Sequence, residues 1–191
     1  AAYVNSPLFR GFEQILIGRA PLDALAIVPR ICGICSVAQS AAAASALAEA
    51  MGIVPTRNGV LSRQLIQATE NLADHLTHFY LFFMPDFARP AYASRPWHAA
   101  AAQRFTALRG TAAAEVLPAR ANFLKLMGFL AGRWPHTLAI QPGGSTRAIT
   151  AGERIRLLAL LREFRSFLER RLFGDVLERI GQLASKAELL A

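Results

Sequence analysis

The chain has 191 residues, of which 53% are hydrophobic, and it carries a formal net charge of +8. Its basic residues are scattered arginines without a cluster of basic and aromatic side chains, which argues against a nucleic-acid partner. Its only two cysteines are too few and too close together to staple a secreted fold, so we expect metal binding or redox chemistry in a reducing compartment, by default the cytoplasm.

The first elements are short. Residues 3–6 are β-like, and residues 8–19 suggest a strand or a short helix before the turn at Ala20-Pro21. The start has no basic region followed by an apolar stretch, so no signal peptide is expected. An alanine-rich helix is predicted from Ser36 to Met51, with Gly52 as its C-cap. Residues 31–48 are charge-poor but rich in small side chains, which is not typical of a membrane span.

Three further helices are expected in the middle of the chain. The first runs from Asn58 to Phe83 and ends at Pro85, and the others cover Pro96–Leu108 and Ala112–Phe129. Apolar residues at helical spacing predict the buried face of the first, and they are Leu61, Leu65, Ala68, Leu72, Leu76, Phe79 and Phe83.

The pattern changes at residues 136–146, which read as an extended segment leading into a glycine loop. Thr150 is expected to cap a last long helix through Phe173, broken by Gly174. The buried face predicted for that helix consists of Ile155, Leu158, Leu161, Phe164, Leu168 and Leu172. The fold class is therefore mainly α, a multi-helix domain over residues 1–191 with a small extended N-terminal part, and the abrupt end suggests a fragment of a longer protein.

Cys32 and Cys35 form a Cys-x-x-Cys pair at the start of the alanine-rich helix, where the helix dipole favours thiolates. The pair can be two buried apolar side chains. A thioredoxin-like dithiol needs a βαβ context that the helical pattern lacks, and a zinc or iron-sulfur site needs four ligands. The remaining interpretation is half of a thiolate metal site, completed by sequence that is not present here.

Other residues able to take part in chemistry give weaker signals. His75 lies within the apolar stripe of its helix and His78 at its edge, which favours hydrogen bonding around a site over metal ligation. Glu13 is a lone carboxylate in an apolar segment, usually a surface acid. Gly143-Gly144 usually means a turn.

Together these residues resemble a known family. The segments FRGFE at 9–13, GRAPLDA at 18–24, RICGIC at 30–35, HLTHFY at 75–80 and PGGSTR at 142–147 are similar to the N-terminal half of the large subunit of nickel-iron hydrogenases. The resemblance covers nearly the whole chain, and its most specific element is the arginine-x-Cys-Gly-x-Cys motif at Arg30–Cys35.

The resemblance implies a set of roles. Cys32 would be a terminal nickel ligand, and Cys35 would bridge nickel and an iron that carries cyanide and carbon monoxide. Glu13 would ligate magnesium, with Arg30, His75 and His78 supporting the site from around it. The complete protein would pair with an iron-sulfur small subunit and split hydrogen, whereas this chain alone would be inactive.

Two departures from the family pattern qualify the resemblance. Catalytic members carry histidine four residues after the bridging cysteine, whereas this chain has Gln39, as in the hydrogen-sensing hydrogenases that report to a histidine kinase. The family's second cysteine pair is absent from the sequence. A catalytic uptake hydrogenase and a non-enzymatic helical interaction domain with a structural Cys-x-x-Cys remain the alternatives.

Overall fold

The computed structural model describes residues 2, 3, 5, 7 and 11–190. These residues are mostly helical, which confirms the expected fold class. The α-helices are α1 (Phe12–Leu16), α2 (Ala24–Ile27), α3 (Ser36–Ala50), α4 (Arg57–Thr77), α5 (His98–Phe105), α6 (Ala112–Phe123), α7 (Lys125–Ala131), α8 (Ala151–Phe167), α9 (Leu177–Ile180) and α10 (Lys186–Leu190). Short 3₁₀ helices cover Pro21–Asp23, Val28–Arg30, Met84–Ala88 and Pro90–Tyr92, and π-helical turns cover His78–Phe83 and Leu168–Phe173. The strands β1 (Ile140–Gln141) and β2 (Gly144–Ser145) pair antiparallel.

The chain forms two compact units. One comprises the residues up to Ala68 together with Leu130–Ala148, and the other comprises Thr69–Phe129 together with the residues from Ile149 onward. Helices α4 and α7 each contribute residues to both units. The organisation of residues 1–191 as one domain stays a prediction.

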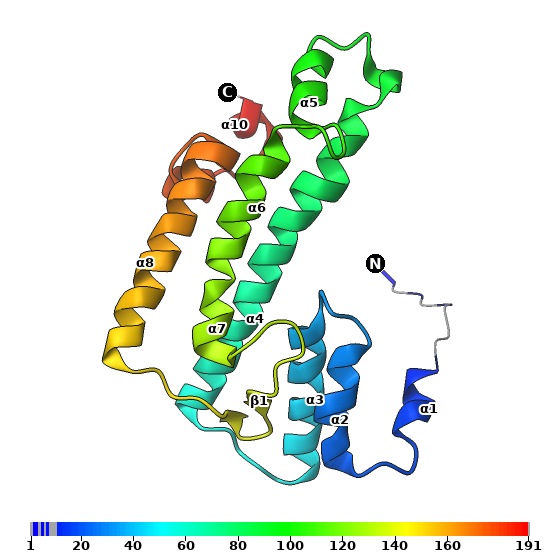
Figure 1. Cartoon of the computed structure of the whole chain (residues 1–191), viewed down its shortest axis with the longest axis vertical. Coiled ribbons are helices and arrows are strands. Elements are labelled where there is room, and N and C mark those ends of the chain that lie inside the picture. The colour runs from blue at the N-terminus through cyan, green and yellow to red at the C-terminus, as the bar shows by residue number, and fades with distance from the viewer. Residues whose placement is uncertain (1, 4, 6, 8–10, 191) are drawn as a thin grey trace. The chain divides into compact units, whose positions relative to one another are not determined.

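The first unit is built around α3, which packs against α2, the 3₁₀ helix Val28–Arg30 and β1 (Figure 1). Alanines and serines dominate the sequence of α3, so neighbouring backbone can approach it closely. After α3, Gly52 adopts a left-handed φ of 65°, and Ile53 N–H donates to Ala48 O at 2.8 Å. This geometry confirms the predicted helix end. A residue with positive φ directs the chain so that the N–H groups after the helix bond its last carbonyls.

Gly144 in β2 meets Gly59 in α4 at close range. A Cβ atom at Gly144 would clash with the Gly59 backbone, and the φ of Gly144 is 128°. Gly143, its neighbour, has no atom within 4 Å of the position that a Cβ would take. The glycine pair is therefore more than a turn, because one member is required by the contact between the hairpin and α4.

The second unit contains α6 beside α8 (Figure 1). Phe123 and Phe164 stack with ring centroids 3.8 Å apart, and Tyr80 lies 6.0 Å from Phe105 and 6.5 Å from Phe167. Thr150 caps α8 with the reciprocal hydrogen bonds of a capping box, Glu153 N–H to Thr150 Oγ1 at 3.2 Å and Thr150 N–H to Glu153 Oε2 at 2.9 Å. The predicted cap is confirmed.

Ion pairs and hydrogen bonds stabilise the segment after α8. Arg165 forms ion pairs with Glu169 and Glu178, and the Leu177 N–H donates to Glu169 Oε1 at 3.1 Å. The hydrogen bonds from Leu177 and from Arg165 hold the pKa of Glu169 below its usual value. Gly174, with φ 72°, ends the helix at the predicted position.

Several predicted boundaries and faces were wrong. The helix expected from Asn58 to Phe83 changes to a π-helical turn after Thr77, and the one expected from Ala112 to Phe129 is divided into α6 and α7. The helix expected from Pro96 begins at His98. Of the strand or short helix expected within residues 8–19, the structure shows a short helix at residues 12–16. The proposed β-like segment 3–6 includes Val4 and Ser6, which lie outside the described residues.

The buried faces of two helices also differ from the prediction. Leu61, Leu65 and Leu72 of α4 are exposed, and the buried side chains of the helix include Ile66, Thr69, Ala73 and Leu76. In α8, Ile155, Leu158 and Leu161 are exposed, whereas Leu157 and Phe164 are buried. Both helices carry apolar residues around much of their circumference, so a second stripe, one position away, satisfies the same helical spacing.

We expect Gly144→Ala to lower the free energy of unfolding by about 1–3 kcal/mol, because the new methyl group must displace backbone and the residue keeps a positive φ. Gly143→Ala is the matched control and should change stability much less. Urea titration followed by circular dichroism measures both variants, and equal effects would contradict the close contact with Gly59.

Phe164→Ala should lower the free energy of unfolding by about 3–5 kcal/mol, since it removes a buried ring stacked on Phe123. Leu161→Ala, on the same helix and 42% exposed, should cost less than about 1 kcal/mol. Urea unfolding monitored by circular dichroism distinguishes the two. A larger loss for Leu161→Ala than for Phe164→Ala would contradict the packing of Phe164 against Phe123.

Candidate metal centre

The two cysteines lie at the beginning of α3. The chain leaves the 3₁₀ helix at Arg30 and turns through residues 31–35, with Cys35 as the N-cap residue of α3. The Ser36 N–H donates to Gly33 O at 3.4 Å, and the Cys35 N–H donates to Cys32 Sγ at 3.4 Å. The turn therefore brings both sulfur atoms to one point beside the helix N-terminus, where the helix dipole favours negative charge.

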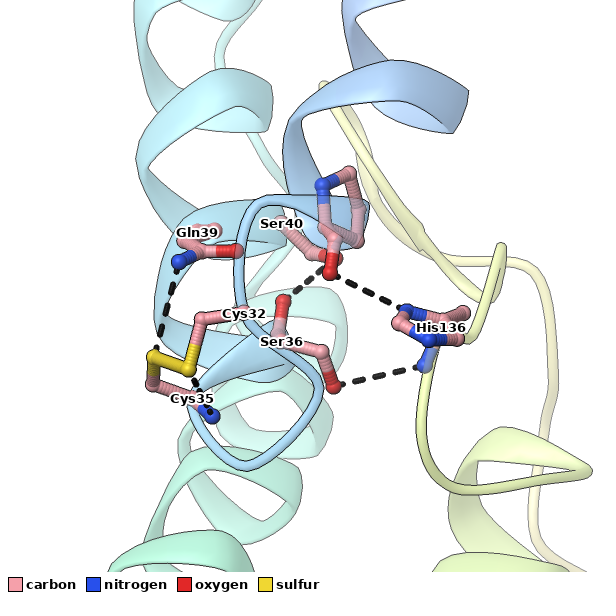
Figure 2. The surroundings of a disulfide bond; sticks show 7 residues. Cys32, Cys35, Ser36, Gln39, Ser40 and His136 are labelled. Carbon is pink, nitrogen blue, oxygen red and sulfur yellow. Dashed lines mark hydrogen bonds between the residues drawn. A yellow bond between two sulfur atoms is a disulfide. The ribbon is translucent and has the colours of Figure 1, made fainter. Parts of the chain in front are cut away.

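In the structure the two sulfur atoms are joined as a disulfide, with Cα atoms 5.5 Å apart (Figure 2). The sequence predicts thiolates at these positions. A disulfide and a pair of thiolates are the oxidised and reduced states of the same two atoms, so ligation of a metal requires the reduced state. Both sulfurs are partly buried, and the exposed Ile34 separates them in the sequence.

Gln39 follows one turn after Cys35 on α3. Its Nε2 donates to Cys35 Sγ at 3.5 Å, and Figure 2 shows the amide directed toward the sulfur pair. Its Oε1 is buried and has no hydrogen-bond partner among the described residues. The amide thus stabilises one sulfur and leaves an acceptor unsatisfied, which normally indicates that the surroundings are completed by another group.

His136 lies against the cysteine turn. Its Nδ1 is 3.0 Å from Pro29 O, and its N–H donates to Ser36 Oγ at 3.3 Å. Figure 2 shows the imidazole on the side of Ser36 away from Gln39. A lone histidine in a loop 100 residues away along the chain carries no sequence signal that would associate it with the cysteines.

Arg30 and the segment around Glu13 lie in the same unit as the cysteines. Arg30 and the helix α1 residues Phe12 and Ile15 line one apolar pocket, and the Arg30 guanidinium donates to Ala26 O. Glu13, in the first turn of α1, is exposed. The fold therefore gathers α1 and Arg30 near one another, but it does not test the metal role expected of Glu13.

His75 and His78 belong to the second unit, and both side chains are exposed. The expectation that His75 lies within a buried stripe is wrong, because the buried face of α4 is formed by other residues. His78 instead stacks with Phe82 and Phe83, at centroid distances of 6.3 and 6.5 Å. Their expected support of a metal site stays a prediction.

The donor set suits a soft metal ion but is incomplete. No group of three or more His, Cys, Asp or Glu side chains that could hold a metal occurs within the described part of the chain. Two thiolates supply half of a four-coordinate soft site. Together with the unsatisfied Gln39 oxygen, the cysteine pair therefore fits a metal whose other ligands come from outside these residues.

The chain is similar in sequence to known proteins. The family described as nickel-dependent hydrogenase matches residues 10–114. The large subunit of the periplasmic [NiFeSe] hydrogenase of Desulfomicrobium baculatum is 32% identical over 87% of this chain and 35% of its own length. The Hydrogenase-1 large chain of Escherichia coli K12 is 45% identical over 38% of this chain and 12% of its own length.

The fold agrees as well. The reduced Ni-Fe-Se hydrogenase from D. vulgaris Hildenborough superposes with a TM-score of 0.75 at 31% identity, over 87% of this chain and 36% of that one. The chain thus spans about a third of the length of these relatives. Sequence and fold lead to the same conclusion, that the chain belongs to the nickel-dependent hydrogenase family.

Proposed function

We propose that this chain contributes two thiolate ligands to the nickel-iron centre of a hydrogenase large subunit, which in its complete form binds and splits hydrogen. The observation that carries the proposal is the meeting of Cys32 and Cys35 sulfurs at the N-terminus of α3, with the Gln39 amide on Cys35. Membership of the nickel-dependent hydrogenase family supports it.

Cys32 is proposed as a terminal nickel ligand and Cys35 as the bridge between nickel and iron. Soft, polarisable thiolates match these metals, and a sulfur with spare lone pairs can serve two of them. The N-terminus of α3 and the Gln39 Nε2 hydrogen bond both stabilise negative charge on the Cys35 sulfur. When bound, the centre, with cyanide and carbon monoxide on its iron, supplies the metals at which hydrogen is cleaved heterolytically.

The remaining expected roles are part of the same proposal. Glu13 would bind magnesium, because a carboxylate oxygen is the hard donor that this ion prefers. The Glu13 side chain is exposed and is therefore accessible to the ion. Arg30, at the entrance to the cysteine turn, would contribute positive charge near the centre. His75 and His78 would support the site from around it in the complete protein. An iron-sulfur small subunit would receive the electrons.

The subtype depends on Gln39. We favour a hydrogen-sensing protein that reports to a histidine kinase, because Gln39 resembles the residue of the hydrogen-sensing hydrogenases at this position and its amide lies beside the Cys35 sulfur. A catalytic uptake hydrogenase is the second candidate, and relatives named uptake hydrogenase, such as that of Rhodobacter capsulatus, favour it. A purely structural Cys-x-x-Cys in an interaction domain is disfavoured by the family assignment.

A cytoplasmic location is also proposed. Among the described helices, none is long and apolar enough to cross a membrane. The name of the Desulfomicrobium baculatum relative places that protein in the periplasm. The proposed metal ligation requires Cys32 and Cys35 in the reduced state, which the cytoplasm maintains.

Cys35→Ser in the complete subunit should abolish incorporation of nickel and iron, because a serine hydroxyl is a hard, weakly acidic donor that cannot bridge these metals. Cys32→Ser should be similarly severe. Elemental analysis of the purified protein and hydrogen-dependent dye reduction measure the effect. Ile34→Ala is the matched control, since Ile34 lies between the cysteines with its side chain 50% exposed. Normal metal content in Cys35→Ser would contradict the ligand assignment.

Gln39→His should leave both metals in place and change the hydrogen response, because it exchanges a neutral amide beside Cys35 Sγ for a titratable imidazole. Gln39→Leu, which removes the donor without adding a titratable group, separates loss of the hydrogen bond from gain of the imidazole. Metal analysis, turnover and the electron paramagnetic resonance spectrum of the centre are the measurements. Loss of both metals in Gln39→His would mean that Gln39 has another role.

A further inference from the structure

His136 contacts both ends of the cysteine turn. Its imidazole reaches Pro29 O, three residues before Cys32, and its backbone N–H reaches Ser36 Oγ, directly after Cys35. We propose that His136 is a positioning residue that holds the turn in the shape that brings the two sulfur atoms together. The proposal rests on the function proposed above, in which these sulfurs are metal ligands.

The contact with Pro29 O determines which ring nitrogen of His136 carries a proton. A carbonyl oxygen only accepts hydrogen bonds, so the proton must be on Nδ1 for His136 to bond Pro29 O at 3.0 Å. The ring also faces the middle of the turn, because a Cβ atom added at Gly33 would be 3.8 Å from Cε1 and 3.9 Å from Nε2. The imidazole therefore lies beside Gly33 as well as bonding Pro29 before Cys32.

The two anchor points are themselves rigid. Ser36 is fully buried in the first turn of α3, and Ser40 Oγ donates to Ser36 O at 2.9 Å. Pro29 is buried in the 3₁₀ helix that precedes the turn. His136 joins these two points, Pro29 through its imidazole and Ser36 through its backbone N–H, and so restricts the residues between them, which carry the sulfur atoms (Figure 2).

The segment that carries His136 is also braced. Arg133 Nε donates to His136 O at 3.0 Å, and the buried Thr137 Oγ1 donates to Ala131 O at 2.7 Å. His136 adopts a left-handed φ of 63°, which is uncommon for a residue other than glycine, although histidine takes it more often than most. A residue held in this conformation by its neighbours presents its side chain to the turn at a defined angle.

The consequence is preorganisation of the sulfur pair. Two thiols held close together have a high effective concentration toward one another and toward a shared metal. Without the His136 contact, the turn can relax, and the time that the two sulfurs spend together falls. The effect is on Cys32 and Cys35 geometry and does not require His136 to touch a metal.

The test is the thiol-disulfide equilibrium of the 191-residue chain with glutathione, in which two glutathione thiols are oxidised to one glutathione disulfide as the Cys32–Cys35 disulfide is reduced to two thiols. Because the chain has no other cysteine, the signal reports this pair alone. His136→Gly, which tolerates the positive φ, should make disulfide formation roughly five- to tenfold less favourable. His136→Asn retains a donor and tolerates positive φ, so it should restore most of the wild-type value.

Two further variants separate positioning from loss of fold. Ser36→Ala removes the other anchor and should shift the equilibrium in the same direction by about two- to fivefold. Leu138→Ala, an exposed neighbour on the same segment, should leave it unchanged. Circular dichroism confirms that each variant is folded. Wild-type equilibria in both His136→Gly and Ser36→Ala overturn the proposal, whereas an absence of nickel from the complete wild-type protein would overturn only the proposed function.

Discussion

The N-terminus of α3 determines what this part of the molecule can do. The turn through residues 31–35 ends where the helix begins, so the Cys32 and Cys35 side chains meet beside backbone N–H groups that favour negative charge. The sulfurs thereby gain proximity and an environment that stabilises thiolates. Only small residues allow the surrounding segments to approach α3 closely, which explains the run of alanine and serine that follows the cysteines.

Residues from different segments contact the cysteine turn at the start of α3. Gln39 reaches back along the same helix to the Cys35 sulfur, and His136 reaches the turn from a segment far away in the sequence. The hairpin that follows His136 is fixed in turn by the close approach of Gly144 to Gly59.

The sequence predicted local features better than contacts between distant segments. The extent of α3, the Gly52 end and the Thr150 cap follow from chemistry within a few residues, and the structure confirms them. Leu76 in α4 and Phe164 in α8 are buried as predicted, but most of the other leucines assigned to the two buried faces are exposed. Hydrophobic periodicity fits two adjacent stripes, and only packing chooses between them. His136 could not be found from one sequence, since its contacts with Pro29 and Ser36 cross about a hundred residues. The cysteine pair was recognisable because its spacing, helix start and flanking arginine all lie within six positions.

Nickel K-edge X-ray absorption of the complete reduced protein tests the central claim most directly, if the thiol state of Cys32 and Cys35 is determined by mass spectrometry on the same sample. The account predicts nickel with sulfur ligands, and both cysteines reduced and protected from alkylation until the metal is removed. Nickel bound only through nitrogen and oxygen, or bound nickel in a protein whose Cys32 and Cys35 remain joined as a disulfide, would contradict it.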